Sequence, residues 1–173
     1  MASVAFDIQR MNRSDLSEVL EIEQACFTTP WSRSSFMVEV ENTGRSYPLV
    51  VRARGREGAA PLMGYVCVWR VQGELWINNL AVHPSHRRRG LGTRLLQAAL
   101  DMGRKLGCEH ALLEVRLSNQ QARRLYRHQG FHTVGLRRRY YPDDLEDALV
   151  MSASLRLRPT TRRGHDWMGS ETR

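Results

Sequence analysis

The feature that most constrains this chain is a strand–helix–strand unit predicted in its middle. Residues 74–83 and 110–116 are short apolar segments, and residues 90–106 between them have helical periodicity. The apolar stripe of that helix is expected to consist of Leu91, Leu95, Ala98, Met102 and Leu106. Two strands of one sheet that are joined by a helical crossover run parallel. The sequence therefore predicts a parallel pair, in which the second strand, HALLEVR, is expected to be buried on both faces.

The rest of the chain adds strands and helices on both sides of this unit. Ser14 and Asp15 are expected to cap a first helix, and Ser32 or a neighbour a second. Ser118, with Gln121 three residues later, forms a predicted capping box for another helix. The other predicted strands span residues 4–11, 47–54, 62–71, 131–141 and 148–155. The order β-α-α-β-β-β-α-β-α-β-β predicts an α/β (α+β) fold with a mixed central sheet and no internal repeat.

Composition bounds the domain organisation and the partners. The chain has 173 residues and 42% hydrophobic content, which suits one globular domain, placed at residues 1–155. The formal net charge is +8, yet five arginines against Asp166 and Glu171 put +3 of it in residues 156–173. Because this tail lacks periodicity, we expect a basic, disordered segment. The remaining body is mildly basic, so acidic partners are compatible with it, but DNA is not required.

Cysteine usage and hydropathy indicate the compartment. Cys26, Cys67 and Cys108 are odd in number, far apart and without C-x-x-C spacing, which favours reduced thiols in the cytoplasm. No apolar run approaches the length of a membrane span, and residues 1–11 lack the apolar core of a secretion signal. His83 and His86 have no nearby carboxylate or cysteine to complete a metal site. We therefore expect no membrane contact and no metal.

The stretch HRRRGLGT at residues 86–93 opens the central helix and has two interpretations. Three arginines before a helix are often a solvated rim or a nucleic-acid patch. Alternatively, Gly90 and Gly92 let a phosphate approach the unpaired N–H groups of the helix N-terminus closely. The segment lacks the spacing and lysine of a Walker loop, and no acidic residue follows in the ribose-binding position of a dinucleotide fold.

Four motifs in order resemble the GNAT superfamily of N-acetyltransferases. Arg87-x-x-Gly90-x-Gly92 after INNLAVHP matches its [Q/R]-x-x-G-x-[G/A] signature, and LEVRLSNQQARRLYRHQGF matches its second half. CFTTPWS, LEVRLSN and RRRYYP followed by EDALVM are similar to its RimI-like branch, the ribosomal-protein-alanine N-acetyltransferases. The resemblance covers residues 4–155. It implies a GNAT fold whose fourth and fifth strands splay apart, and direct acetyl transfer from acetyl-CoA to an amine.

The resemblance assigns the cofactor to main-chain groups more than to side chains. It implies that the pyrophosphate of coenzyme A lies on the loop and helix start, and the pantetheine arm between the splayed strands. The adjacent Asn78 and Asn79 break the apolar alternation of their strand, as a β-bulge would, although two solvent-facing asparagines explain them as well. The expected cofactor contacts are Leu80, Ala81, Val82, Arg87, Arg88, Arg89, Gly90, Leu91, Gly92, Thr93 and Asn119.

Two residues are expected to move protons. Glu114 lies inside the apolar run ALLEV, where a carboxylate must lie at a cleft or be paired, for instance with Arg116 or another arginine. The resemblance implies that Glu114 is the general base and that Tyr126 is the general acid for the leaving sulfur. From the residues alone, Tyr126 is a core tyrosine at the edge of a helix's buried stripe.

The acceptor is expected at the other end of the site. By the resemblance, Trp31, Tyr140 and Tyr141 contact the N-terminus of an acceptor protein, an alanine on a small-subunit ribosomal protein, although simple loop packing also explains them. The arginines at 137–139 either repel a basic acceptor or alternate along a strand. Two alternatives stay open: another amine acceptor (a broader set of N-termini, a lysine or a small amine), and a non-catalytic ribosome- or RNA-binding module. A monomer is expected.

Overall fold

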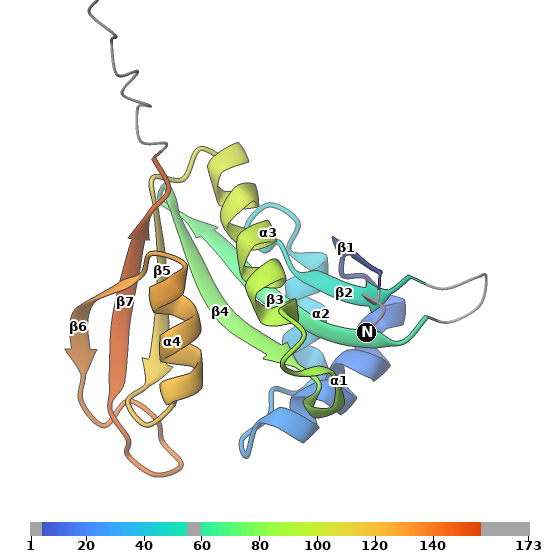
Figure 1. The fold of residues 1–173 in the computed structure, drawn as a ribbon, viewed down its shortest axis with the longest axis horizontal. Coiled ribbons are helices and arrows are strands. Elements are labelled where there is room, and N and C mark those ends of the chain that lie inside the picture. The colour runs from blue at the N-terminus through green and yellow to red at the C-terminus, as the bar shows by residue number, and fades with distance from the viewer. Residues whose placement is uncertain (1–4, 55–59, 157–173) are drawn as a thin grey trace, which may run out of the picture.

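The computed structural model describes residues 5–54 and 60–156, which form a single sheet with helices on both faces (Figure 1). The element order is the predicted one, with two short 3-10 turns, η1 and η2, added. The elements are β1 Phe6–Arg10, η1 Arg13–Asp15, α1 Leu16–Cys26, α2 Arg33–Glu41, β2 Leu49–Ala53, β3 Leu62–Val71, β4 Glu74–Val82, η2 Pro84–His86, α3 Leu91–Lys105, β5 His110–Arg116, α4 Gln120–His128, β6 His132–Arg137 and β7 Ala148–Ser154. Within these ranges, no helix has the length and apolar content to cross a membrane.

The seven strands lie in the order β1-β2-β3-β4-β5-β7-β6, and β4–β5 is the parallel pair, as predicted. The two strands are in register from Glu74 opposite His110 to Ile77 opposite Leu113. Beyond that point β4 pairs only with β3, and β5 pairs only with β7. Figure 1 shows the two strands side by side at their starts and apart further on. The splayed fourth and fifth strands are therefore confirmed.

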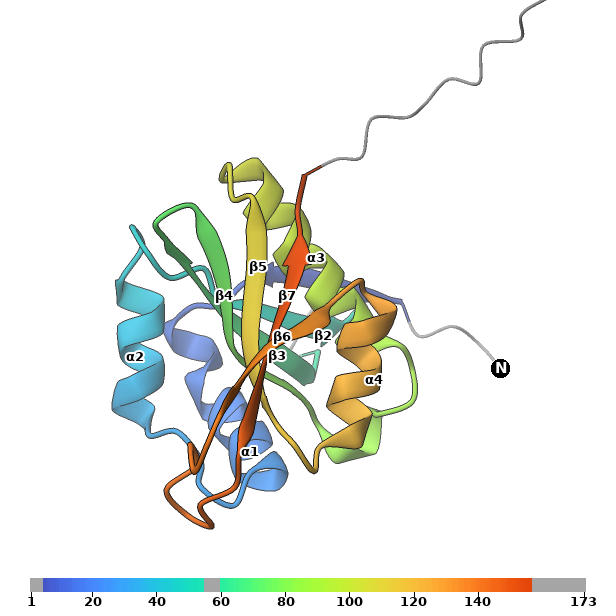
Figure 2. The same cartoon turned by 90° about the vertical axis from the view of Figure 1, so that its left-hand side faces the viewer.

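Helices cover the sheet in two layers, seen on opposite sides in Figure 2. On one face, α3 and α4 bury a cluster that includes Leu95, Leu96 and Tyr126. On the other face, α1 and α2 bury a smaller cluster that includes Phe36 and Tyr65. Because side chains alternate along a strand, β2 sends Leu49 and Val51 to the first cluster and Val50 to the second.

The buried face of α3 differs in part from the predicted stripe. Leu91 and Leu95 are buried as expected, but Ala98, Met102 and Leu106 are only partly buried. The fully packed positions are Leu91, Leu95, Leu96, Ala99, Leu100 and Gly103. A Cβ at Gly103 would lie 2.8 Å from Leu75 Cδ2, so this glycine allows the helix to approach β4 closely. Because Gly103 is at the contact with β4, the buried face of α3 is centred away from Met102.

The expectation that β5 is buried on both faces is wrong. Ala111, Leu113 and Val115 are buried under the helices, whereas Glu114 and Arg116 on the opposite face are half-buried. The apolar Leu112 on that face gives the run its misleading continuity. Consequently β5 presents one polar face, and Glu114 lies on it.

The predicted caps of α1 and α4 are confirmed only in part: Asp15 holds the N-cap position of α1 but makes no side-chain cap hydrogen bond there. Asn12 caps η1 before α1, accepting from the Ser14 N–H at 2.9 Å, while the Asp15 carboxylate accepts from the Asn12 N–H. Asn119, and not Ser118, caps α4, since the Asn119 side chain accepts from the Ala122 N–H; the Ser118 N–H donates to the Glu146 carboxylate at 2.6 Å. Ser32 caps α2 as predicted.

Of the last two predicted strands, the first is shorter at its loop end and stops at Arg137, whereas the second begins at Ala148 as predicted. Residues 138–147 form a loop in which the N–H groups of Tyr140 and Tyr141 donate to the Glu146 carbonyl. The strands predicted over 131–141 and 148–155 are β6 and β7. The predicted tail, residues 156–173, lies outside the described residues except for Arg156, so its disorder and the domain boundary stay predictions.

Candidate active site

A bulge in β4 opens the sheet where the parallel strands separate. Cys67 of β3 faces Asn79, and the next residue, Val68, faces Ile77, so Asn78 is the extra residue. The bulge predicted from the two asparagines is confirmed. A bulge bends its strand and disrupts the ladder locally. Here it lies immediately after Ile77, the last residue of β4 that pairs with β5.

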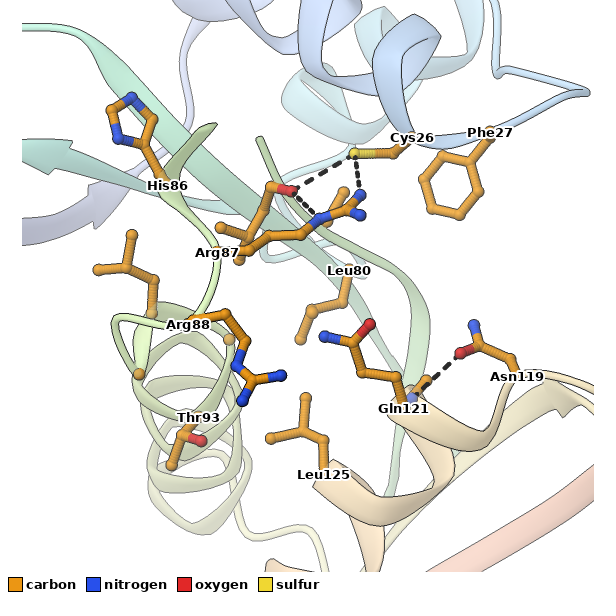
Figure 3. A pocket seen from close by; sticks show the side chains of 16 residues that line it. Cys26, Phe27, Leu80, His86, Arg87, Arg88, Thr93, Asn119, Gln121 and Leu125 are labelled. Atoms are coloured by element: carbon orange, nitrogen blue, oxygen red, sulfur yellow. Dashed lines mark hydrogen bonds between the residues drawn. The ribbon is translucent and has the colours of Figure 1, made fainter. Parts of the chain in front are cut away.

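A cavity of about 380 Å³ lies on one side of this opening. It is bounded by the end of β4, the loop and first turn of α3, and the start of α4 (Figure 3). Of the eleven residues expected to contact the cofactor, ten line it and Arg89 does not. The complete lining is Cys26, Phe27, Leu80, Ala81, Val82, His86, Arg87, Arg88, Gly90, Leu91, Gly92, Thr93, Asn119, Gln121, Ala122 and Leu125.

The main chain at the start of α3 faces this cavity. Gly90 has φ of 75° and caps the helix without a side chain, and Arg88 before it also has a left-handed φ of 64°. The first α-helical bond of α3 runs from the Arg94 N–H to the Gly90 carbonyl. The N–H groups of Leu91, Gly92 and Thr93 therefore precede the helical ladder, at the positive end of the helix dipole. This arrangement suits an anionic group.

The three arginines of the loop have different places. The Arg87 guanidinium turns back to the end of β4, donating to the Val82 carbonyl at 3.2 Å and to Cys26 Sγ at 3.3 Å. The Arg88 side chain points between Thr93 and Leu125 in Figure 3. Arg89 does not contribute to the lining. The charge of the loop is thus spread, and the glycines and main chain shape the cavity.

Some residues that line the cavity were not predicted, although a sequence pattern indicates some of them. Ala122 and Leu125 follow Asn119 at three-residue intervals along α4, a helical spacing that indicates a shared face. Cys26 and Phe27 come from the end of α1, more than fifty residues away in sequence, and nothing local indicates them. The Asn119 carboxamide oxygen accepts from the Ala122 N–H at 3.1 Å, so its oxygen acts as the cap.

A second cavity, of about 320 Å³, lies beside the bulge and is built from side chains. Its lining is Trp31, Trp69, Trp76, Ile77, Asn78, Glu114, Tyr140 and Tyr141. The three residues expected to contact the acceptor are thereby brought together with Glu114. Sequence reasoning missed Trp69 and Trp76, which face each other across the β3–β4 pair.

Glu114 is ion-paired in this cavity, though not with Arg116. Its carboxylate lies 2.5 Å from Arg137 Nε, and its side chain is 17% exposed against 51% for Arg137. A hydrogen bond from the Tyr140 hydroxyl to the Glu114 carboxylate raises the pKa of Tyr140. Within the run 137–139, Arg137 contacts the site through its ion pair with Glu114, and Arg139, with φ of 49°, lies in the following loop.

Arg116 anchors the loop that carries the two tyrosines. Its guanidinium lies 2.7 Å from Asp143, 2.8 Å from Asp144 and 3.2 Å from Glu146. It also lies over the Tyr141 ring, 3.8 Å from the centroid. Beyond it, the Thr29 hydroxyl donates to Asp143 at 3.2 Å, which links the α1–α2 loop to the same loop. The loops that bear the predicted acceptor contacts are thus joined to each other.

Tyr126 lies in the core of the α3–α4 face. Its ring packs against Phe131 with centroids 5.8 Å apart, and the residue is 8% exposed. Burial, with a smaller contribution from Tyr141, raises the pKa of Tyr126 to about 12. Tyr126 lines neither cavity, although its neighbours Ala122 and Leu125 on α4 line the first.

The fold and the two cavities define an acyltransferase of the GNAT type, and comparison with known proteins agrees. Residues 16–131 match the sequence profile of the Acetyltransferase (GNAT) family. The chain belongs to this family, and it is an acetyl-CoA-dependent N-acetyltransferase. Among the described residues, no group of three or more His, Cys, Asp or Glu converges as a metal site requires.

The chain is also similar to individual N-acetyltransferases. The [ribosomal protein bS18]-alanine N-acetyltransferase of Escherichia coli (strain K12) is 34% identical over 152 residues, covering 87% of this chain and 98% of that protein. The crystal structure of the Escherichia coli ribosomal-protein-S18-alanine N-acetyltransferase superposes with a TM-score of 0.78 at 30% identity, covering 91% and 98% of the two chains. The N-alpha-acetyltransferase RimI of Mycobacterium tuberculosis is 34% identical over 150 residues, 83% of this chain and 89% of its own.

Proposed function

We propose that this enzyme transfers acetyl from acetyl-CoA directly to the α-amino group of a protein N-terminus, the N-terminal alanine of a small-subunit ribosomal protein. The observation that carries the proposal is that the two cavities lie close together along β4, at its bulge. Asn78 lines the side-chain cavity, and Leu80, two residues on, lines the cavity at the helix start. The names of the Escherichia coli relatives supply the acceptor.

The first cavity fits coenzyme A. A Cβ at Gly92 would lie 3.5 Å from Leu125 and 3.9 Å from Val82, so larger side chains would fill the space in front of the helix start. The N–H groups of residues 91–93 would hold the pyrophosphate, and Arg88 would add positive charge. The pantetheine arm would lie between β4 and β5, where neither strand pairs with the other.

The same gap provides the group that polarises the thioester. From Asn79 to Val82, β4 pairs with β3 along one edge, and its other edge no longer pairs with β5. A main-chain N–H on that free edge, near Leu80 or Val82, would donate to the carbonyl oxygen of the acetyl group. Such a donor stabilises the negative charge that develops on the oxygen during attack.

Glu114 would take the proton from the acceptor amine. An α-amino group has a pKa of about 7.7–8.0, so near neutral pH it is mostly protonated and needs a base. Glu114 lines the acceptor cavity on the polar face of β5. The half-exposed Arg137 would have to move aside as the ammonium group approaches the carboxylate.

Tyr126 would return a proton to the leaving sulfur. Because its pKa is raised to about 12, its phenol stays protonated throughout the neutral range and remains a donor. It lies one residue after Leu125, which lines the cofactor cavity. A buried, neutral tyrosine at this position supports the role of general acid.

The reaction is proposed for the cytoplasm, with the monomer as the working unit. One chain supplies both cavities, so no second copy is needed to complete the site. Cys26, Cys67 and Cys108 are free thiols, in keeping with a reducing compartment.

Mass spectrometry tests the proposal and its alternatives together. The enzyme and acetyl-CoA are incubated with peptides that differ in residue one, and with an N-terminally blocked peptide that contains lysine. We expect acetylation of the α-amino group, most rapidly for the alanine peptide. Acetylation of the lysine peptide alone would overturn the proposal that the acceptor is a protein N-terminus. If no amine is acetylated, the result would favour a non-catalytic binding module.

A further inference from the structure

Within residues 5–54 and 60–156, three carboxylates are almost fully buried, and two of them have no cationic partner among those residues. Asp15, 2% exposed, pairs with Arg52 at 2.6 Å. Glu23, 1% exposed, and Glu39, 3% exposed, are instead held by neutral donors. Burying an uncompensated carboxylate is costly, and hydrogen bonds are what offset that cost. The identity of the donors therefore shows what each glutamate holds in place.

The donors to Glu23 come from two walls of the acceptor cavity and from the strand beneath it. The Trp31 N–H donates at 2.8 Å, and the Asn79 carboxamide nitrogen at 3.2 Å. The Tyr65 hydroxyl of β3 donates to Oε2, the same oxygen that accepts the 3.2 Å bond from Asn79, while Trp31 donates to Oε1. Trp31 lines the acceptor cavity, and Asn79 follows the bulge residue Asn78, which also lines it. One side chain of α1 thus joins the α1–α2 loop to the bulged strand.

Glu39 repeats this arrangement on α2. The Trp69 indole N–H donates to its two carboxylate oxygens at 3.0 and 2.8 Å, and the Ser46 hydroxyl donates to it as well. Arg45 covers the Trp69 ring, 4.3 Å from its centroid. Trp69 is another wall of the acceptor cavity. Both buried glutamates therefore fix aromatic walls of the same cavity, and only Glu23 also reaches β4.

We infer that Glu23 is a positioning residue for acetyl transfer: it holds the Trp31 wall and the bulge of β4 at a fixed separation. The inference rests on the proposed function, because it takes the second cavity as the acceptor site. Glu23 lines neither cavity, so it acts through Trp31 and Asn79. Loss of Glu23 should loosen the acceptor cavity. It should not displace the first turn of α3, where coenzyme A is proposed to bind.

Steady-state kinetics of Glu23→Ala, with Asp15→Ala as the matched control, test the inference. Asp15 is equally buried and near the same helix, but its partner Arg52 lines neither cavity. Glu23→Ala should raise the KM for the acceptor peptide about tenfold, the loss expected for one or two buried hydrogen bonds. Its KM for acetyl-CoA should stay that of the wild type. Asp15→Ala should lower thermal stability and leave both KM values unchanged.

Glu23→Gln gives the same test in a side chain of the same shape, should Glu23→Ala not fold. The amide oxygen can still accept from Trp31, but the amide nitrogen cannot accept from Asn79. The acceptor KM should rise less than in Glu23→Ala. Wild-type acceptor KM in the folded variant, or an equal rise of both KM values, overturns the inference.

Hydrogen exchange separates this inference from the proposed function, because it needs no acceptor. Amide exchange in the Trp31 loop and in residues 78–80 should be faster in the Glu23 variant than in Asp15→Ala. If the wild type acetylates no peptide N-terminus, the proposed function fails, and exchange alone decides the role of Glu23. Equal exchange in the two variants overturns the inference even if the peptides are acetylated.

Discussion

The two cavities at the β4 bulge are built in different ways. The cofactor cavity is shaped by main chain, by two glycines and by a helix start; of the loop arginines, Arg88 lines it and Arg87 turns back to the end of β4. The acceptor cavity is shaped by five aromatic side chains, a carboxylate and an asparagine. Its walls come from two loops and three strands, which ion pairs and buried glutamates hold in place.

The two cavities should therefore respond differently to substitution of their residues. A site made of backbone tolerates side-chain substitution unless the new atoms enter the cavity. A site made of side chains depends on each residue and on the groups that orient it.

Glu114→Gln should cause the largest loss. Without the base, kcat should fall by about 10²–10⁴-fold, the usual contribution of general base catalysis. The loss should be greatest below the pKa of the amine, about 7.7–8.0, where the amine is mostly protonated. A pH–rate profile measured with the acceptor peptide checks this. A profile unchanged from wild type would remove Glu114 as the base.

Tyr126→Phe should depress kcat by about 10²-fold, at the lower end of the range for acid catalysis, with little change in affinity for acetyl-CoA. The wild-type pKa of about 12 lies above the usual value of about 10, so the acid form is kept as pH rises. Wild-type kcat should therefore not decline between about pH 8 and pH 10. A variant with normal kcat would exclude the acid role.

Gly92→Val should act on the other cavity. The branched side chain would overlap the space in front of Leu125 and Val82, and the KM for acetyl-CoA should rise about tenfold, as overpacking predicts. Gly92→Ala is the control, since its Cβ makes ordinary contacts of 3.5 Å. The acceptor KM should not change in either variant. Equal cofactor KM values for valine and alanine would contradict the backbone cradle.

Arg116→Met should loosen the tyrosine loop by removing its ion pairs and the contact with Tyr141. We expect the acceptor KM to rise about threefold, because partly exposed ion pairs contribute little each. High salt should reduce the difference between variant and wild type. Titrating the acceptor peptide at two salt concentrations measures the acceptor KM of the variant and of the wild type.

Arg88→Ala should have the smallest effect. If main-chain N–H groups hold the pyrophosphate, removing one exposed charge should raise the KM for acetyl-CoA about twofold, less than Gly92→Val does. Measuring the KM for acetyl-CoA of both variants in parallel shows which substitution has the larger effect. A larger effect at Arg88 would mean that side-chain charge dominates the cofactor cavity.

The contrast also explains what the sequence could predict. The cofactor loop was predictable because glycine, helix start and strand end are neighbours in sequence, and Asn78-Asn79 indicated the bulge. The partner of Glu114 was not. Arg137 reaches Glu114 because β7 lies between β5 and β6, an order that chain sequence does not reveal.

Two other features depended on packing that local patterns do not encode. The half-buried polar face of β5 was not predicted, because Leu112 makes the run appear apolar throughout. Trp69 and Trp76 both reach the acceptor cavity because they pair across β3 and β4 on the hairpin side of the bulge, a register that local patterns do not give.

The central claim is that the two cavities form one transfer centre through the gap between β4 and β5. A crystal structure with a bisubstrate analogue, coenzyme A linked to an alanine-starting peptide, tests it most directly. We predict the pyrophosphate on the N–H groups of residues 91–93, the linker in the gap beside Leu80, and the peptide between Trp31 and Glu114. A peptide arm bound outside the cavity lined by Trp31 and Glu114 would contradict the account.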